Sequence, residues 1–227
     1  MASSSDAYVP VPRHLTTRLL YPNPACALVT ANDPGTLGGH NVMTITWLTP
    51  VDNLGLLFLS LNASRHSAGN VLRERGFTLS VLTEAQRSVA LACGSVHGTA
   101  MQGGKLAALQ LRTHVPEGGG LPVLADSPAH LWCSVVSVLA PSEQGAGAAG
   151  SGAGAPLPPT IKGHLALLCV IDRASVRADY WATGKLLTPS APGLPRLLCF
   201  LGSGVFAAME EVRAEGEGGE APTKQIE

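Results

Sequence analysis

The sequence predicts an all-β protein, mainly strands with a few short helices, closed into a barrel. Several short apolar runs are separated by turns rich in glycine and proline, which is typical of all-β folds. Helical spacing of apolar residues is confined to short segments. Strands and long helices do not alternate regularly along the chain, so a doubly wound α/β domain is not expected.

The first third of the chain predicts an arm and three strands. Residues 1–20 contain Pro10 and Pro12 and predict an extended arm. The run at 25–31 is short, apolar and bounded by proline and an Asn-Asp-Pro-Gly turn, which favours a strand over a helix. A second strand is expected over 39–51. A third, at 56–62, is almost continuously apolar, as in strands buried on both faces.

The middle of the chain predicts two short helices with one strand between them. Apolar residues at helical spacing follow Ser64, which we interpret as the helix N-cap, with Gly76 as the residue that ends the helix. A fourth strand is expected over 77–82. Thr83 and Gln86 then have the spacing of a capping box, which opens a helix to about Cys93.

The last part predicts two long strands around a low-complexity insertion. A short helix at 103–111 precedes a strand from about residue 130, and a further strand-like run lies at 163–181. Residues 141–160 are Gly, Ala, Ser and Pro rich and predict a flexible insertion. This insertion is either a domain boundary or an expanded hairpin loop. We favour one domain over 21–209, with a disordered polar tail at 210–227.

The composition limits the classes of partner. Of 227 residues only 14% are charged, against about 25% in ordinary soluble domains. So little charge predicts apolar surface buried in an oligomer, although a monomer with a small-residue surface stays open. The oligomer that we expect is a homodimer. A net charge of −1 without a basic cluster argues against nucleic-acid or membrane-surface binding.

The cysteines and the N-terminus bear on the compartment. No N-terminal signal region is visible, and no apolar run reaches the ~18 residues of a membrane span. The odd number of scattered cysteines predicts buried, reduced thiols and a cytoplasmic protein rather than a disulfide frame or a zinc site. They are Cys26, Cys93, Cys133, Cys169 and Cys199.

One strand carries an unusual set of polar residues. Hydroxyls, an amide and a tryptophan are expected on the strand at 39–51, and such groups suit an uncharged ligand rich in hydrogen-bonding atoms. The alternative is an edge strand that is merely polar on one face. The candidate residues are Asn41, Val42, Met43, Thr44, Thr46 and Trp47.

A second candidate lies where the third strand gives way to a helix. Hydroxyls and cations at a helix N-terminus can bind a phosphate, because the backbone N–H groups and the helix dipole favour an anion. The alternative is an ordinary capped helix with a solvated Arg-His pair. The candidate residues are Ser60, Asn62, Ser64, Arg65, His66 and Ser67.

The segment PNPACALVTANDPGTLGGHNVMTITWLTPV resembles the opening of the flavin reductase-like family, whose members are FMN-binding, flavoredoxin-like split barrels. The resemblance continues through SLNASRHSAGNVLRERGFTLSVL and, more weakly, to about Met209. It implies a split β-barrel of Greek-key type. It also implies that the polar strand holds the flavin ring and that the strand-to-helix turn holds the FMN phosphate.

Two further positions follow from this resemblance. An Asp-Lys-Phe-like tripeptide of the family corresponds to Gly104-Lys105-Leu106, so Lys105 becomes a cofactor-binding candidate; the alternative is a solvated lysine. His164 corresponds to a histidine that precedes a Gly-Glu-Val strand ending in the family. That ending is replaced here, so we interpret His164 as structural.

The functional hypothesis is an FMN-binding oxidoreductase that uses NADH or NADPH, with hydride passing through flavin N5. Because the flavin carries this chemistry, no catalytic side chain is assigned. The remaining histidines have no ligand spacing, so no metal site is expected. A non-enzymatic flavin-binding or electron-carrier protein is the alternative, and a ligand-free scaffold is a third reading.

Overall fold

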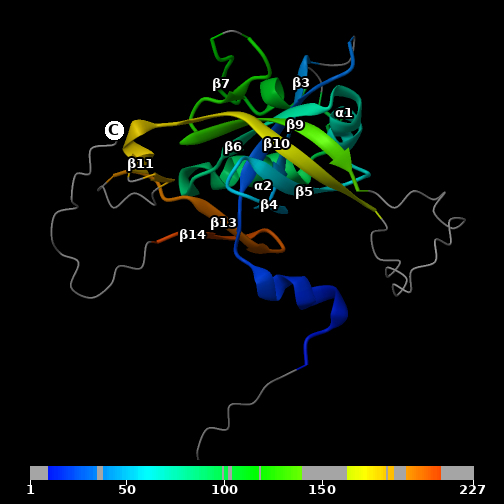
Figure 1. The fold of residues 1–227 in the computed structure, drawn as a ribbon, viewed down its shortest axis with the longest axis vertical. Helices are drawn as coiled ribbons and strands as arrows, with labels where there is room; N and C mark the ends of the chain where they lie inside the picture. Colours follow the sequence, from blue (N-terminus) through cyan, green and yellow to red (C-terminus); the bar gives the residue numbers. More distant parts are fainter. Residues whose placement is uncertain are drawn as a thin grey trace, which may run out of the picture.

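The computed structural model describes residues 10–34, 38–98, 100–101, 104–117, 119–139, 163–182, 184–186 and 193–210. Strands hold more of these residues than helices do, which confirms the predicted mainly-β class (Figure 1). The predicted insertion at 141–160 and all but the first residue of the predicted tail lie outside the described residues. The strands on either side of that insertion pair directly with each other.

The strands are short except for two. Their bounds are β1 Asn23–Pro24, β2 Cys26–Ala31, β3 His40–Ile45, β4 Leu48–Pro50, β5 Leu56–Asn62, β6 Gly76–Val81, β7 Thr113–His114, β8 Val123–Leu124, β9 Ala129–Val138, β10 His164–Val176, β11 Trp181–Ala182, β12 Lys185–Leu186, β13 Leu198–Gly202 and β14 Val205–Ala208. The helices are the 3₁₀-helix η1 Arg13–Leu20, α1 His66–Glu74, the 3₁₀-helix η2 Glu84–Gln86, α2 Arg87–Ser95, α3 Lys105–Ala108 and the 3₁₀-helix η4 Ala178–Tyr180.

Seven strands form one antiparallel sheet in the order β3-β2-β6-β9-β10-β5-β4. Its two edge strands, β3 and β4, follow each other in the chain with only Thr46 and Trp47 between them. Three peptide units span at most about 11 Å, whereas seven strands laid flat would place the edges about 29 Å apart. The sheet therefore has to curl until its edges nearly meet, which makes a barrel with an open seam.

The interior of this curled sheet is the main core. Alternate residues of β5 point inward, so Leu57, Leu59 and Leu61 are buried while their neighbours are partly exposed. They pack with Leu28 and Leu79, among others, in one apolar cluster. A second cluster lies on the outer face, where α2 and α3 cover β2 and β3.

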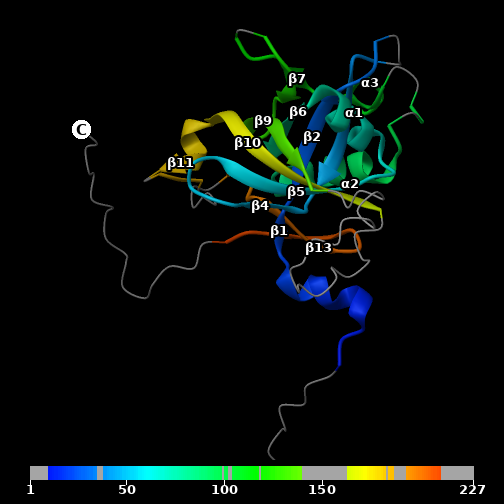
Figure 2. The ribbon, with the colours of Figure 1, turned by 45° about the vertical axis from the view of Figure 1, so that its right-hand side comes forward.

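A second, three-stranded sheet with the order β1-β13-β14 lies beside the barrel. Figures 1 and 2 show η1, in blue, projecting beyond this sheet. None of the residues of η1 is buried. None of the helices within the described residues has the length and hydropathy needed to cross a membrane.

Three local predictions are wrong. The arm is not extended over Arg13–Leu20, because the stretch between Pro12 and Pro22 holds no proline and Leu15 N–H can bond to the Pro12 carbonyl at 2.8 Å. The strand at 39–51 is broken at Thr46 and Trp47, where the chain leaves one sheet edge for the other.

The third wrong prediction concerns the ends of α1. The N-cap is Arg65, because the Ser64 hydroxyl instead donates to Asn62 Oδ1 at 2.7 Å. At the other end Arg75, not Gly76, takes the left-handed conformation, with φ of 57°. The Arg75 guanidinium donates to the carbonyls of Val135 and Val136, which holds that conformation in place.

Other local predictions are confirmed. The third strand has the predicted bounds 56–62, and the strands expected at 25–31 and 77–82 are each displaced by one residue at most. The capping box of Thr83 and Gln86 is present. All five cysteines are buried and unpaired.

One buried histidine makes the fold sensitive to acid. His130 is 7% exposed, and its Nδ1 lies 3.2 Å from Ser80 Oγ. Burial, helped by the neighbouring His114, lowers the pKa of His130 from 6.5 to about 4. The unfolded chain therefore takes up this proton first. The stability that neutral His130 contributes is complete above about pH 6.5 and is lost as the pH falls towards 4.

We predict that His130→Gln flattens this part of the pH profile. Over the window from pH 6.5 to 4 the wild type should lose up to about 3 kcal/mol of unfolding free energy through this group. Urea unfolding of both proteins at several pH values measures the difference. Parallel profiles for the two proteins would contradict the prediction.

Candidate functional site

The free edge of β3 is lined by two adjoining cavities, which we call together the edge cleft. The larger has a volume of about 390 Å³ and the smaller about 40 Å³. Met43, Thr44 and Arg65 line both. The cleft therefore follows β3 along the seam of the barrel, from α1 to the β13–β14 hairpin.

The backbone of β3 faces this cleft. At a sheet edge, every second residue turns its N–H and C=O away from the neighbouring strand. The Val42 carbonyl accepts a hydrogen bond from Lys105 Nζ at 3.0 Å, so Val42 is one of these residues. The same alternation directs the backbone groups of Thr44 to the free edge. Thr44 lines both cavities, so its N–H and C=O suit a flat ligand with hydrogen-bonding atoms along its rim.

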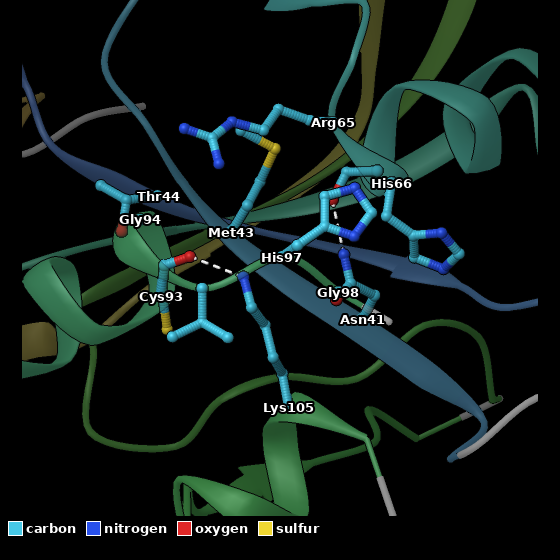
Figure 3. A pocket seen from close by; sticks show the side chains of 12 residues that line it. Asn41, Met43, Thr44, Arg65, His66, Cys93, Gly94, His97, Gly98 and Lys105 are labelled. Atoms are coloured by element: carbon cyan, nitrogen blue, oxygen red, sulfur yellow. Dashed lines mark hydrogen bonds between the residues drawn. The ribbon is translucent and has the colours of Figure 1, made fainter. Parts of the chain in front are cut away.

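Lys105 is the deepest cation of the site. It is only 2% exposed, and its ammonium also donates to the Cys93 carbonyl at 2.7 Å (Figure 3). Burial lowers the pKa of Lys105. Lys105 is thus not solvated; it joins the end of α2 to the edge of β3. Both of its acceptors among the described residues are neutral carbonyls, so no bonded carboxylate cancels its charge.

Side chains of β3 fix the strand against both helices. Asn41 Nδ2 donates to Ser67 Oγ of α1 at 2.7 Å (Figure 3). Thr44 Oγ1, on the opposite face, donates to the Ala90 carbonyl of α2 at 2.5 Å. The polar residues of this strand therefore serve partly as structural anchors.

The turn between β5 and α1 presents a cation beside a helix N-terminus. Asn62 Oδ1 accepts bonds from the backbone and the hydroxyl of Ser64, which shapes the turn. Arg65 follows at the N-cap, and Figure 3 shows its side chain extending beside Met43 at the cleft. Backbone N–H groups in the first turn of α1 have no acceptor within the helix. An anion here would meet those groups, the helix dipole and a guanidinium.

His66 is held in a hydrogen-bonded group behind this turn. Its Nε2 lies 3.0 Å from Asn32 Oδ1, which also accepts from Asn70. Burial, followed by the nearby His97, lowers the pKa of His66. His66 is therefore mostly neutral at pH 7, and Arg65 and Lys105 carry the positive charge at this end of the cleft.

The wall of the larger cavity is aromatic. The rings of Trp47 and His164 stack with centroids 4.9 Å apart. His164 Nδ1 lies 3.2 Å from Ser60 Oγ, and Trp47 Nε1 donates to the Tyr21 hydroxyl at 3.1 Å. Burial lowers the pKa of His164, so the ring stays neutral at pH 7. The stack gives the cavity a flat, uncharged side.

The far end of the cleft comes from parts of the chain that sequence reasoning missed. From η1, Arg18 donates through Nη2 to Ser203 Oγ at 2.8 Å, which ties the arm to the β13–β14 hairpin. A Cβ at Gly202 would lie 3.2 Å from the Tyr21 ring, so the hairpin packs closely on the arm. No local signal marks these residues, because the contact joins positions 185 apart in the sequence.

Most of the candidate residues from the sequence meet in this cleft. Those that line it are Asn41, Met43, Thr44, Thr46, Trp47, Ser60, Asn62, Arg65, His66, Ser67 and Lys105. Val42 and Ser64 do not. The Val42 side chain is fully buried in the outer cluster, and only its carbonyl reaches the edge. His164, interpreted as structural, also lines the cleft.

The charge of the cleft suits an anionic ligand. Among the described residues that line it there is no aspartate or glutamate, whereas Arg18, Arg65 and Lys105 are present. No group of three or more metal-ligating side chains is found in the part of the chain that the structure describes.

Two details of the smaller cavity fit an incoming polar group. Asn41 is 2% exposed, and its Oδ1 has no hydrogen-bond partner within the described residues. A donor from a ligand or a water would satisfy it. A Cβ at Gly98 would lie 2.7 Å from this oxygen and 2.7 Å from the His66 ring, so only glycine leaves the space as it is. The donor set and this cradle are compatible with a flavin phosphate and its chain.

Comparison with known proteins decides the family. The model of the flavin reductase like domain matches residues 20–175. The chain belongs to the flavin reductase-like family. No curated protein sequence matches it significantly.

Solved structures of flavin reductases and flavin-binding proteins have the same fold as this chain. A putative flavin reductase with a split barrel domain from Shewanella frigidimarina has a TM-score of 0.68 at 12% identity, covering 88% of this chain and 89% of that chain. An FMN-binding protein from Thermus thermophilus has a TM-score of 0.61 at 18% identity, covering 94% and 99%. The NADH:FAD oxidoreductase SgcE6 of Streptomyces globisporus has a TM-score of 0.58 at 16% identity, covering 91% and 99%. At these identities the likeness establishes the fold.

We predict that Lys105→Met loosens α2 from β3. The change removes two hydrogen bonds to buried carbonyls, and leaving them unmade costs roughly 2 kcal/mol of unfolding free energy. Lys105→Gln, which keeps an uncharged N–H donor, should retain part of that stability. Thermal and urea unfolding compare the three proteins. Equal stability of Lys105→Met and the wild type would remove Lys105 from this role.

Proposed function

We propose that this chain binds FMN in the edge cleft and acts as an NADH- or NADPH-dependent flavin reductase. The observation that carries the proposal is a cleft with several cations and no lining carboxylate, placed on the free edge of β3. Family membership adds support, since the fold is one that holds flavins in its relatives.

The phosphate of FMN fits best at the end formed by α1. Arg65 stands at the N-cap of this nine-residue helix and has no carboxylate partner in the described structure. Bidentate bonds from a guanidinium to a phosphate are charge-assisted and stronger than neutral ones. Ser67 and the first N–H groups of α1 add uncharged donors, and the buried Lys105 adds a positive field.

The isoalloxazine ring fits along β3. The larger cavity has enough volume for a tricyclic ring, and one side is the apolar stack of Trp47 on His164. The edge backbone at Thr44 offers a donor and an acceptor to the polar rim of the ring. In this proposal the main chain of β3 orients the ring through hydrogen bonds, and the side chains determine the shape and the charge of the cavity.

A bound flavin supplies the redox chemistry, because its N5 accepts hydride from a reduced nicotinamide. The protein has to hold the donor against the ring and keep water away. Arg18 places positive charge at the far end of the cleft, where the phosphates of a dinucleotide could be bound. Neutral His164 and Trp47 exclude water from the wall without adding a competing charge.

An electron carrier that binds FMN without turning over a nicotinamide is the second candidate. The burial of Lys105 favours it, because this amine is bonded to two carbonyls and cannot reach out to a reduced flavin. Anaerobic addition of NADPH or NADH to the FMN-loaded protein separates the two. Bleaching of the flavin absorption by a nicotinamide supports the reductase, while bleaching by dithionite alone supports the carrier.

We also propose that the working form is a cytoplasmic homodimer. Leu19, Leu20 and Leu54 are 70%, 80% and 90% exposed, which is costly for a monomer. Five buried, unpaired cysteines suit a reducing compartment. Sedimentation at micromolar concentration should give twice the chain mass, and a monomer at that concentration would contradict the dimer.

We predict that Arg65→Ala weakens FMN binding about ten- to a hundredfold and leaves riboflavin binding nearly unchanged. Losing a charge-assisted bond to phosphate costs about 1.5–3 kcal/mol, and riboflavin has no phosphate to lose. Titration followed by flavin fluorescence measures both affinities. Arg65 is a better test than His66, since removing His66 would also break its contact with Asn32.

The matched control is Arg87→Ala, an exposed arginine at the start of α2 that lines neither cavity. It should bind both flavins as the wild type does. Equal losses of FMN and riboflavin in Arg65→Ala would mean that Arg65 shapes the ring site and does not hold the phosphate.

A further inference from the structure

A second, chemically different cavity lies at one end of the barrel, between the seven-stranded sheet and β13, and it is open to solvent beside Trp181 and Met209, which are 48% and 39% exposed. This barrel-end cavity has a volume of about 560 Å³. Its wall includes Leu57, Leu79 and Leu131, which point into the barrel from β5, β6 and β9. None of its lining residues lines the edge cleft. It is therefore a separate space, although β13 contributes residues to both.

The lining carries almost no charge. Among the residues whose side chains the structure describes, no lysine or arginine lines the barrel-end cavity, so none of them would hold a phosphate or a carboxylate. Its one carboxylate, Asp52, accepts bonds from the backbone of Leu54 and Leu56 at 2.9 and 2.8 Å and is engaged in that turn. A charged ligand would lose its hydration without a partner.

The two thiols in the wall are inert and add to its apolar character. Cys26 and Cys199 both line the cavity and are 2% and 3% exposed. Burial raises the pKa of Cys26 to about 12 and also raises that of Cys199. Both remain neutral thiols at physiological pH, and a neutral buried thiol behaves as a small apolar group.

The size of the cavity sets the size of its ligand. Ligand sites are commonly 300–1,000 Å³ and mostly apolar. An apolar cavity of about 150 Å³ stays dry and accepts benzene. By that measure the barrel-end cavity has room for a molecule of roughly two or three fused or linked rings.

We propose that the barrel-end cavity is a binding site for an uncharged, largely hydrocarbon molecule of two to three rings. Such a ligand removes apolar wall from contact with solvent and needs no polar partner. A cavity that took a nucleotide would need cations, and none lines the barrel-end cavity among the side chains that the structure describes. The site is independent of flavin binding.

The test uses two probes that differ by one charge. N-phenylnaphthylamine is uncharged, and anilinonaphthalenesulfonate has the same rings with an added sulfonate. Equilibrium dialysis of each probe against the full chain, with and without FMN, measures affinity and stoichiometry. We expect one uncharged probe per chain, bound at least tenfold more tightly than the sulfonate, and no displacement by FMN. A melting temperature that rises with the uncharged probe should accompany this binding.

A filling variant locates the probe. Val81 lines the cavity at the end of β6, and Val81→Phe should weaken the uncharged probe at least tenfold. Val136→Phe places the same ring on an exposed position of β9 outside the cavity and should change nothing. If Val81→Phe does not fold, Ala129→Val is the alternative. It adds a smaller side-chain volume to the wall of the same cavity and should also weaken binding of the uncharged probe.

Several results would overturn the proposal. They are an absence of probe binding, equal binding of both probes, or unchanged binding by every filling variant that folds. The affinity for the uncharged probe could also fall as the protein concentration rises and dimers form. That result would mean that a second copy of the chain occupies the cavity, and it would overturn the proposal. Failure of FMN to bind affects none of these readouts.

Discussion

The connection of β3 to β4 by Thr46 and Trp47 is the constraint on which the structure depends. It joins opposite edges of a seven-stranded sheet through two residues, so the sheet has to close. Closure brings the outward-facing side of β5, with Ser60 and Asn62, beside the free edge of β3. The Ser60 N–H bonds to the Trp47 carbonyl at 2.9 Å and fixes the seam. The edge cleft is a consequence of this seam.

The same closure separates two environments. Outside the seam, unpaired backbone groups of an edge strand meet the cations Arg65 and Lys105. Inside the barrel, alternate residues of each strand give an apolar space whose end is not filled. Strand β13 borders both, since Phe200 lines the cleft and Cys199 the barrel-end cavity. A small barrel therefore presents one cleft lined by cations and one cavity lined mainly by apolar side chains.

The sequence predicts what is decided locally. The apolar run at 56–62 forms a strand wherever it lies in the sheet, and Thr83 and Gln86 cap each other within one turn. Polar side chains at the turn after β5 also predict an anion site there, because a helix N-terminus is a local feature. The prediction of a split barrel came from the family resemblance, which is strongest in the first strands.

What could not be predicted depends on contacts between distant residues. The sequence left Lys105 as either a cofactor-binding residue or a solvated lysine. In the structure its ammonium donates to the carbonyls of Val42 and Cys93, which are 63 and 12 residues away in the sequence. The break at Thr46 and Trp47 reflects pairing with β5, not any turn signal. Arg18 joined the site only because the arm folds back to Ser203.

A crystal structure of the protein with FMN would show where the flavin binds. The proposed binding mode predicts electron density for the isoalloxazine along the edge of β3 beside Trp47. It also predicts the phosphate within hydrogen-bonding distance of the Arg65 guanidinium at the start of α1. Density for the flavin at any other place, or a phosphate that points away from Arg65 into solvent, would contradict it.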